Sequence, residues 1–143
     1  MTDGNVVDYD VIRADINRLS EVYDIREIAI DRWNSTQLQQ QLIGDGMTVV
    51  QFGQGFASMP APTKHLERLV IDGKIDHGGD PVLRWMASNV VVRQDEAGNL
   101  KPAKNKSLER IDGIVAAIMG LGRYLGTKHK PQSVYARRGV ISL

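Results

Sequence analysis

The chain has 143 residues, of which 42% are hydrophobic and 24% are charged, and its formal net charge is +1. These values are typical of one globular domain and exclude a largely disordered chain, and the absence of cysteine excludes disulfides and thiolate zinc sites. No apolar run reaches the roughly 20 residues that span a bilayer, and no signal-peptide pattern is present, so we expect a soluble intracellular protein without a membrane partner.

Acidic and basic residues are separated along the chain. Residues 1–31 contain eight acidic residues and three arginines, whereas the segment from Lys101 onward contains nine Lys and Arg but only two acidic residues. The basic C-terminal third favours an anionic partner. A solvated basic tail explains the same charges equally well.

The first half of the chain alternates helical and extended patterns. Residues 8–23 repeat apolar side chains at helical spacing behind Asp8, which can cap the helix. Residues 25–31, IREIAID, are short and rich in isoleucine, which indicates a buried strand. A second helix follows from Asn34, and MTVVQFG (residues 47–53) predicts a second strand. The apolar side of the second helix consists of Leu38, Leu42 and Ile43.

The second half predicts three more helices and a hairpin. One helix over residues 62–72 begins at Pro62, and another follows Asp80, which can cap it. A Gly-Asn turn at residues 98–99 lies between two extended segments and predicts a β-hairpin. Ser107 is the expected cap of the last helix, whose apolar stripe consists of Ile111, Ile114, Val115, Ile118, Leu121 and Leu125.

Helices and strands that alternate with short connections are typical of α/β proteins with parallel neighbouring strands. The sequence therefore predicts an α/β fold with parallel central strands, flanking helices and a β-hairpin insertion. One domain is expected over residues 1–126, followed by a basic C-terminal tail over residues 127–143.

Two acidic residues stand out because they adjoin apolar elements. Asp31 ends the first strand, and Asp112 lies about 100° around the last helix from the centre of its apolar stripe. If the helix packs beside the strand end, the two carboxylates converge, and a divalent cation between them relieves their repulsion. Such an ion can activate water for attack on a phosphodiester. Alternatively, Asp31 caps the following turn, and Asp112 is exposed or paired with Arg110.

Three segments occur in an order that is similar to a known family: YDIREIAIDRWN, HGGDPVLRWMASN and KNKSLERIDGIVAAIMGLGRY. They resemble the C-terminal nuclease domain of the large terminase subunit of tailed bacteriophages, over most of residues 6–125. The resemblance implies a ribonuclease-H-like, metal-dependent endonuclease that cuts double-stranded viral DNA during packaging in the host cytoplasm. It also implies that Asp31 and Asp112 are catalytic and bind two divalent ions, either Mg²⁺ or Mn²⁺, in the complete site.

Four further residues are candidates for the same site. Lys104 and Lys106 precede the last helix, where a lysine can neutralise a scissile phosphate or the charge that develops during cleavage. Arg32 adjoins Asp31 and can contact DNA, and His77 lies in a glycine turn that permits close approach to DNA or metal. The alternatives are solvated lysines, an arginine paired with an acid, and a structural histidine.

The family pattern is incomplete at the amino end of this chain. In a ribonuclease-H-like fold three antiparallel strands precede the first helix and the first strand supplies a further metal-binding acid, but MTDGNVV (residues 1–7) is too short for them. The chain also has no GxxxxGK(S/T) loop of an ATPase motor. We therefore expect a fragment, a split gene product or a remnant. It would pair with a terminase ATPase region or another packaging protein, or associate with itself through an open strand edge. A non-catalytic packaging or assembly module that binds DNA or a protein is the alternative function.

Overall fold

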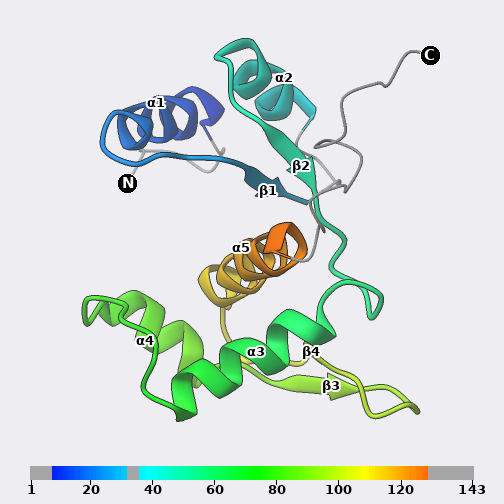
Figure 1. Cartoon of the computed structure of the whole chain (residues 1–143). Helices are drawn as coiled ribbons and strands as arrows, with labels where there is room; N and C mark the ends of the chain where they lie inside the picture. Colours follow the sequence, from blue (N-terminus) through cyan, green and yellow to red (C-terminus); the bar gives the residue numbers. More distant parts are fainter. Residues whose placement is uncertain (1–7, 32–35, 129–143) are drawn as a thin grey trace, which may run out of the picture.

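The computed structural model describes residues 8–31 and 36–128. In chain order these residues form α1 (Tyr9–Ser20), β1 (Ile28–Ile30), α2 (Thr36–Gly44), β2 (Val49–Gln51), α3 (Pro60–Ile71), α4 (Pro81–Ser88), β3 (Val92–Gln94), β4 (Leu100–Pro102) and α5 (Asp112–Lys128) (Figure 1). The predicted α/β class is confirmed. None of the helices in these two ranges is long and apolar enough to cross a membrane.

β1 and β2 form a parallel pair, in which Ile28 is opposite Val49 and Ile30 is opposite Gln51. α2 connects the two strands, and α1 and α2 lie on one side of the pair while α5 lies on the other (Figure 1). The predicted parallel neighbours are therefore confirmed for this pair. Each strand has only three residues, and β1 is half-buried where a buried strand was predicted, because no third strand lies beside it within the described ranges.

The predicted hairpin is confirmed by the antiparallel pair of β3 and β4. Gly98 has a φ of 79°, the left-handed conformation that glycine adopts without steric cost, which explains the turn at this position. Arg93 is directly opposite Lys101 in the register of the two strands. Like charges in this relation destabilise a hairpin unless an anion or a neutral acceptor compensates them.

Two helices begin at the caps that the sequence predicts. The Asp8 carboxylate accepts hydrogen bonds from the backbone N–H groups of Asp10 (2.9 Å) and Val11 (3.3 Å), and the Asp80 carboxylate accepts one from Leu83 (2.6 Å). These bonds satisfy N–H groups that have no partner inside the helix.

The boundaries of the other predicted helices differ by a few residues. α3 begins at Pro60, two positions before Pro62, and α5 continues through Gly126 to Lys128, beyond the predicted domain end at residue 126. The proposed tail from residue 129 onward lies outside the described residues.

The predicted cap of α5 at Ser107 is wrong, because this helix begins five residues later, at Asp112. The Ser107 hydroxyl donates to the carbonyl of Ala103 (3.0 Å) and accepts from the N–H of Val91 (3.3 Å). Both bonds tie the segment after β4 to the hairpin. Ser107 therefore stabilises a turn and has no part in helix capping.

The core is built around α5. Its buried residues are Met59, Ile111, Val115, Ile118 and Met119, and Ala29, Phe52, Leu66, Val90 and Ile114 pack against them. The Phe52 ring lies so close to Gly122 that an added Cβ would be 2.6 Å from it, so glycine permits this contact. The predicted apolar side of α2 is correct for Leu38 and Leu42, which are buried, but wrong for Ile43, which is 58% exposed.

An ion pair joins α1 to the end of α2. The Arg13 guanidinium donates to both oxygens of the Asp45 carboxylate, and the Asn17 amide donates to the same carboxylate at 2.8 Å. The Asp45 side chain is 15% exposed. The hydrogen bonds from Arg13 and then from Asn17 lower the pKa of Asp45 to about 2.

This ion pair gives a testable pH dependence of folding stability. Because an aspartate in an unfolded chain has a pKa of about 3.9, the lowered pKa of Asp45 stabilises the folded state above about pH 4. The stabilisation is lost as the pH falls towards 2. We expect Asp45→Asn to lower the free energy of unfolding at neutral pH and to weaken its dependence on pH below about 4, as measured by urea unfolding.

The matched control is Asp15→Asn, which removes an exposed carboxylate that pairs with Arg18 within α1. It should leave the pH dependence close to that of the unchanged chain, since exposed pairs contribute little. An acid transition of the same shape in Asp45→Asn and the unchanged chain would contradict the role given to this ion pair.

Candidate functional site

Asp112 is the first residue of α5 and is held in place from two sides. The preceding residue, Ile111, is 2% exposed in the core, and the following N–H, of Gly113, lies 3.1 Å from the sulfur of Met86 on α4. The positive end of the helix dipole favours a carboxylate at this position. The Asp112 side chain is 60% exposed, so it faces solvent. The expectation from its helical position, that it lies at the margin of the buried face, is wrong.

Lys104 forms an ion pair with Asp112. Its ammonium nitrogen lies 2.8 Å from Oδ1 of Asp112, and its side chain is 45% exposed. Lys104 lies in the turn after β4, eight positions before its partner. The structure thus brings together two of the residues that the sequence singled out, and it pairs Asp112 with Lys104 where Arg110 had been the expected alternative.

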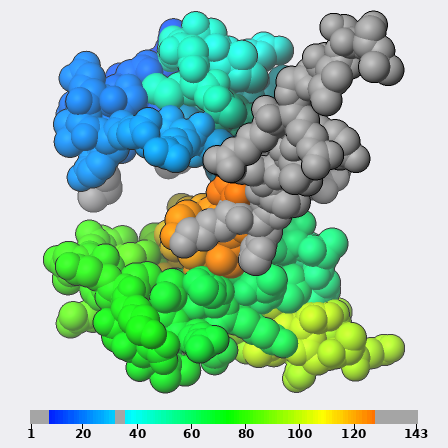
Figure 2. All heavy atoms as spheres, in the orientation of Figure 1, coloured from blue at the N-terminus to red at the C-terminus, as the bar shows by residue number. Residues whose placement is uncertain are grey.

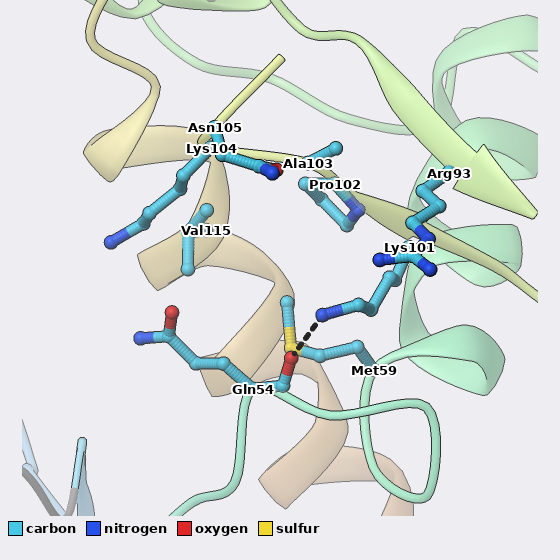
Figure 3. A pocket seen from close by; sticks show the side chains of 9 residues that line it. All are labelled: Gln54, Met59, Arg93, Lys101, Pro102, Ala103, Lys104, Asn105 and Val115. Atoms are coloured by element: carbon cyan, nitrogen blue, oxygen red, sulfur yellow. Dashed lines mark hydrogen bonds between the residues drawn. The ribbon is translucent and has the colours of Figure 1, made fainter. Parts of the chain in front are cut away.

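A hollow of about 230 Å³ lies beside this pair, and we call it the basic hollow (Figure 3). Its polar lining consists of Gln54, Arg93, Lys101, Lys104 and Asn105. The Lys101 ammonium donates to the carbonyl of Gln54 at 2.9 Å and lies 5.2 Å from the centre of the Phe56 ring. Its charge therefore remains unneutralised by any acid in these contacts. Arg93 also lines the hollow, and Lys104 does so while paired with Asp112, so the lining has an excess of cations that favours an anion.

A second hollow, of about 300 Å³, lies on the other side of Lys104, and we call it the Asp112 hollow. It is lined by Lys104, Leu108, Glu109, Arg110, Ile111 and Asp112. Lys104 is thus common to the basic hollow and to the Asp112 hollow. In Figure 3 its side chain extends away from Lys101 and Arg93.

Asp31 is half-buried and follows β1, which packs against α5. At the start of β1, Glu27 accepts a hydrogen bond from Arg123 near the end of α5 at 2.7 Å, and this bond raises the pKa of Arg123. After β2, the Gln54 amide lies 3.7 Å from the sulfur of Met119, closer to the start of the helix. The residue before the strands thus contacts a late position of α5, and the residue after them contacts an earlier one, so the strands run in the direction opposite to α5. We infer that the carboxyl end of β1, with Asp31, points towards the amino-terminal half of α5.

The largest of the hollows described here, about 590 Å³, lies between the start of β1 and the last turns of α5. It is lined by Asp24, Ile25, Arg26, Glu27, Thr48, Gly120, Arg123, Tyr124 and Thr127. In Figure 2 the N-terminal elements (blue and cyan) lie above the visible part of α5 (orange), the two regions that supply this lining. None of the predicted site residues that the structure describes lines it.

The other predicted site residues are placed differently. Lys106 is exposed in the same turn as Lys104. His77 is exposed in the loop between α3 and α4, before two glycines with φ of 63° and 71°, and its imidazole makes no hydrogen bond or ion pair within the described part of the chain. Arg32 lies outside the described residues. No contact described here joins His77 to Asp112 or Lys104.

Two basic residues of the site escaped the sequence interpretation, namely Arg93 and Lys101. Both lie on the hairpin, whose turn at Gly98 fixes the register that places them opposite each other. If the strand register is inferred from the position of that turn, Arg93 and Lys101 form a cross-strand pair of like charges. Such a pair is an unusual choice for stability and therefore a signal of anion binding.

Among residues 8–31 and 36–128, no group of three or more His, Cys, Asp or Glu side chains could hold a metal ion. Carboxylate oxygens are the ligands that Mg²⁺ and Mn²⁺ prefer. Asp31 and Asp112 carry oxygens of this kind, but within these ranges neither belongs to a group of three or more such side chains.

A family model described as "Terminase large subunit, endonuclease domain" matches residues 1–128. The chain belongs to this family. The resemblance carried by the three segments around Asp31, His77 and Asp112 is thereby confirmed.

Relatives of this terminase nuclease domain include the terminase large subunit of Enterobacteria phage HK97, with 42% identity over 123 residues, which are 85% of this chain and 24% of that protein. Protein YmfN of Escherichia coli strain K12 is 32% identical over 125 residues, which are 86% of this chain and 28% of that protein. The crystal structure of the HK97 large terminase matches with a TM-score of 0.77 and 40% identity, over 85% of this chain and 26% of that one. The chain spans about a quarter of the length of these relatives.

Proposed function

We propose that this chain is the nuclease domain, ribonuclease-H-like in fold, of a phage or prophage terminase and hydrolyses phosphodiester bonds of double-stranded DNA during packaging, in the host cytoplasm. The family match supports the reaction class. The observation that carries the proposal is the position of Asp112 at the start of α5. Lys104 contacts Asp112 and also lines the basic hollow, so the acid and the hollow are neighbours.

Asp31 and Asp112 would hold Mg²⁺ or Mn²⁺ through their carboxylate oxygens, with two ions in the complete site. A further acid would come from an upstream region or from a separate chain. When bound, such ions polarise a phosphoryl oxygen and lower the pKa of water. The contribution of Asp112 is a negative charge whose position is fixed by the buried residue before it.

The basic residues would bind the phosphate backbone. Arg93, Lys101 and Lys104 surround one hollow, and Lys106 adjoins it on the same turn. Contacts of this kind fix the position of a duplex without reading its sequence. A lysine close to the scissile phosphate also offsets the negative charge that develops during cleavage, which is the catalytic role of Lys104. Arg32 and His77 remain candidates for additional DNA contacts.

The test is nicking of a supercoiled plasmid with Mn²⁺ or Mg²⁺, compared with the same reaction in EDTA. It should be performed with the 143-residue chain and with the chain joined to its upstream coding region. Metal-dependent nicking in either form supports the proposal. If neither form cuts DNA, the non-catalytic packaging or assembly module takes its place.

The open edge of β1 supports a protein partner. The Ile28 N–H donates to Thr48 (2.8 Å) and the Ile30 carbonyl accepts from Phe52 (2.8 Å), both towards β2. Because backbone groups alternate along a strand, the N–H and C=O of Ala29 point to the opposite edge. No other strand in the described ranges pairs with that edge. A terminase ATPase region, another packaging protein or a second copy of the chain could cover it.

We expect the isolated chain to self-associate through this edge, because unpaired strand edges template pairing with another chain. Light scattering should show an average mass that rises with protein concentration. The rise should persist at about 1 M salt, where charge attraction involving the basic residues is screened. A mass that stays monomeric at high concentration contradicts this expectation.

A further inference from the structure

Two cations of the basic hollow have hydrogen-bond donors to spare. The Arg93 guanidinium is exposed and makes no hydrogen bond or ion pair within the part of the chain that the structure describes. Its five N–H groups are therefore available to a ligand. Lys101 uses one of its three N–H groups on the carbonyl of Gln54, at 2.9 Å, and keeps two. Both side chains come from the hairpin, from directly opposite positions of β3 and β4.

The basic hollow has an excess of two positive charges. Its lining contains Arg93, Lys101 and Lys104 and no acidic residue. Lys104 is paired with Asp112 at 2.8 Å and extends away from the other two cations (Figure 3). Arg93 and Lys101 thus remain, with a combined charge of +2.

The nearest acids on the hairpin do not cancel this charge. Asp95 and Glu96 line a separate hollow together with Arg93, but no ion pair joins either of them to Arg93 among the described residues. The Asp95 carboxylate instead accepts hydrogen bonds from the N–H (2.8 Å) and the side-chain amide (2.9 Å) of Asn99. It therefore serves the turn of the hairpin.

The floor of the basic hollow is apolar. Met59, Ala103 and Val115 line it and are only 2–4% exposed. Such a surface offers no acceptor that would compete for the N–H groups of Arg93 and Lys101. It also keeps water from one side of a bound anion, which strengthens the attraction between opposite charges.

A charge of +2 matches a terminal phosphate better than a phosphate inside a DNA strand. A phosphodiester within the strand carries one negative charge and has two free oxygens. A phosphate monoester at a strand end has three free oxygens and a charge of about −1.5 to −2 at pH 7. The monoester can therefore accept more of the spare hydrogen bonds and neutralise both cations.

We propose that the basic hollow binds the terminal phosphate monoester of a DNA end, with Arg93 and Lys101 as its main ligands. The inference rests on the proposed function and deepens it by naming the form of DNA that this hollow prefers.

The preferred DNA end is also a product of the proposed reaction. In hydrolysis the oxygen of water bonds to phosphorus, the bond from phosphorus to one nucleoside oxygen breaks, and that oxygen takes a proton. One new end therefore carries a phosphate monoester and the other carries a hydroxyl. Because Lys104 lines the hollow and contacts Asp112, the phosphate-bearing end is retained beside the residue where the cut is proposed to occur.

The test compares three short duplexes of one sequence, with 5′-phosphate, 3′-phosphate or only hydroxyl ends. Binding of the full chain is followed by fluorescence anisotropy of an internal label, in EDTA so that no cleavage occurs. A phosphate at one of the two kinds of end should tighten binding roughly three- to tenfold over hydroxyl ends, the contribution of a partly exposed charge-assisted contact. The arm that shows this preference identifies the end.

Arg93→Gln should reduce the ratio of the two affinities, phosphate over hydroxyl, to about one. Arg93 is exposed, so the variant is expected to fold, which urea unfolding verifies. The matched control is Arg84→Gln, which removes an exposed cation from α4 that lines neither the basic hollow nor the Asp112 hollow. It should keep the ratio of the unchanged chain. Equal ratios in the two variants refute the inference.

A further arm adds inorganic phosphate, with chloride at the same ionic strength as reference. Phosphate should compete for the hollow and lower the ratio of the unchanged chain. If phosphate raises the thermal stability of the unchanged chain but not of Arg93→Gln, while no duplex end is preferred, the hollow takes free phosphate. The assignment to a DNA end is then refuted.

Failure of this inference can be told from failure of the proposed function. If all three duplexes bind equally well and Arg93→Gln weakens all three alike, the hollow holds the DNA backbone. The DNA contact of the proposed function then stands, and only the preference for an end is refuted. If the full chain binds none of the duplexes, the DNA contact fails and the inference fails with it.

Discussion

Asp112→Asn and Asp31→Asn are each expected to reduce Mn²⁺-dependent plasmid nicking by at least about a hundredfold, whichever form of the chain is active. Asparagine keeps the shape of aspartate but removes the charge that binds a divalent cation. The measurement is the rate of conversion of supercoiled to relaxed plasmid at saturating Mn²⁺.

The matched control for Asp112 is Glu109→Gln. Glu109 is an exposed carboxylate that lines the same hollow, so its loss changes the local charge equally while leaving Asp112 in place. We expect it to nick plasmid at nearly the unchanged rate. Undiminished nicking by Asp112→Asn, or equal losses in Asp112→Asn and Glu109→Gln, would contradict the role of Asp112 as a specific ligand.

Loss of activity in Asp112→Asn should not reflect unfolding. The substitution removes one exposed ion pair with Lys104 and a favourable interaction with the start of α5. Together these contribute about 1 kcal/mol. A urea unfolding curve close to that of the unchanged chain would separate a chemical defect from a folding defect.

Ile118→Ala is expected to lower the free energy of unfolding by about 2–5 kcal/mol, the largest stability effect that we expect. Ile118 is 1% exposed at the centre of the α5 cluster, so truncation leaves a cavity that its neighbours fill only partly. Urea unfolding followed by circular dichroism measures the difference.

Ile43→Ala is the control for this substitution, because it removes the same atoms from a helix position that is 58% exposed. Its expected effect is within about 0.5 kcal/mol. Equal destabilisation by the two variants would mean that the α5 cluster is not the core of the isolated chain.

Local signals predicted the elements of this fold well. Asp8 and Asp80 cap their helices by accepting hydrogen bonds from N–H groups two or three residues further on. Such caps can therefore be predicted from a few residues of sequence. Ser107 misled because its hydroxyl bonds to Val91 and Ala103, a contact that depends on the closed hairpin. Ile43 misled because helical spacing alone does not define how wide the covered face of α2 is.

The sequence singled out Lys104 and Asp112 of the candidate site, but it indicated neither Arg93 and Lys101 nor the contacts among these residues. Lys104 and Asp112 were each singled out, yet their ion pair depends on the path of the turn between β4 and α5, which no periodicity encodes. Arg93 and Lys101 converge through strand register. The metal-binding role of Asp31 and Asp112 stays a prediction.

The hydrogen bonds of Ser107 have a mechanical consequence. Its hydroxyl joins the residue before β3, the residue after β4 and the segment that leads into α5. The hairpin and the segment that leads to Asp112 are therefore joined by these two hydrogen bonds as well as by the chain, so a change in the hairpin also acts on the path of that segment.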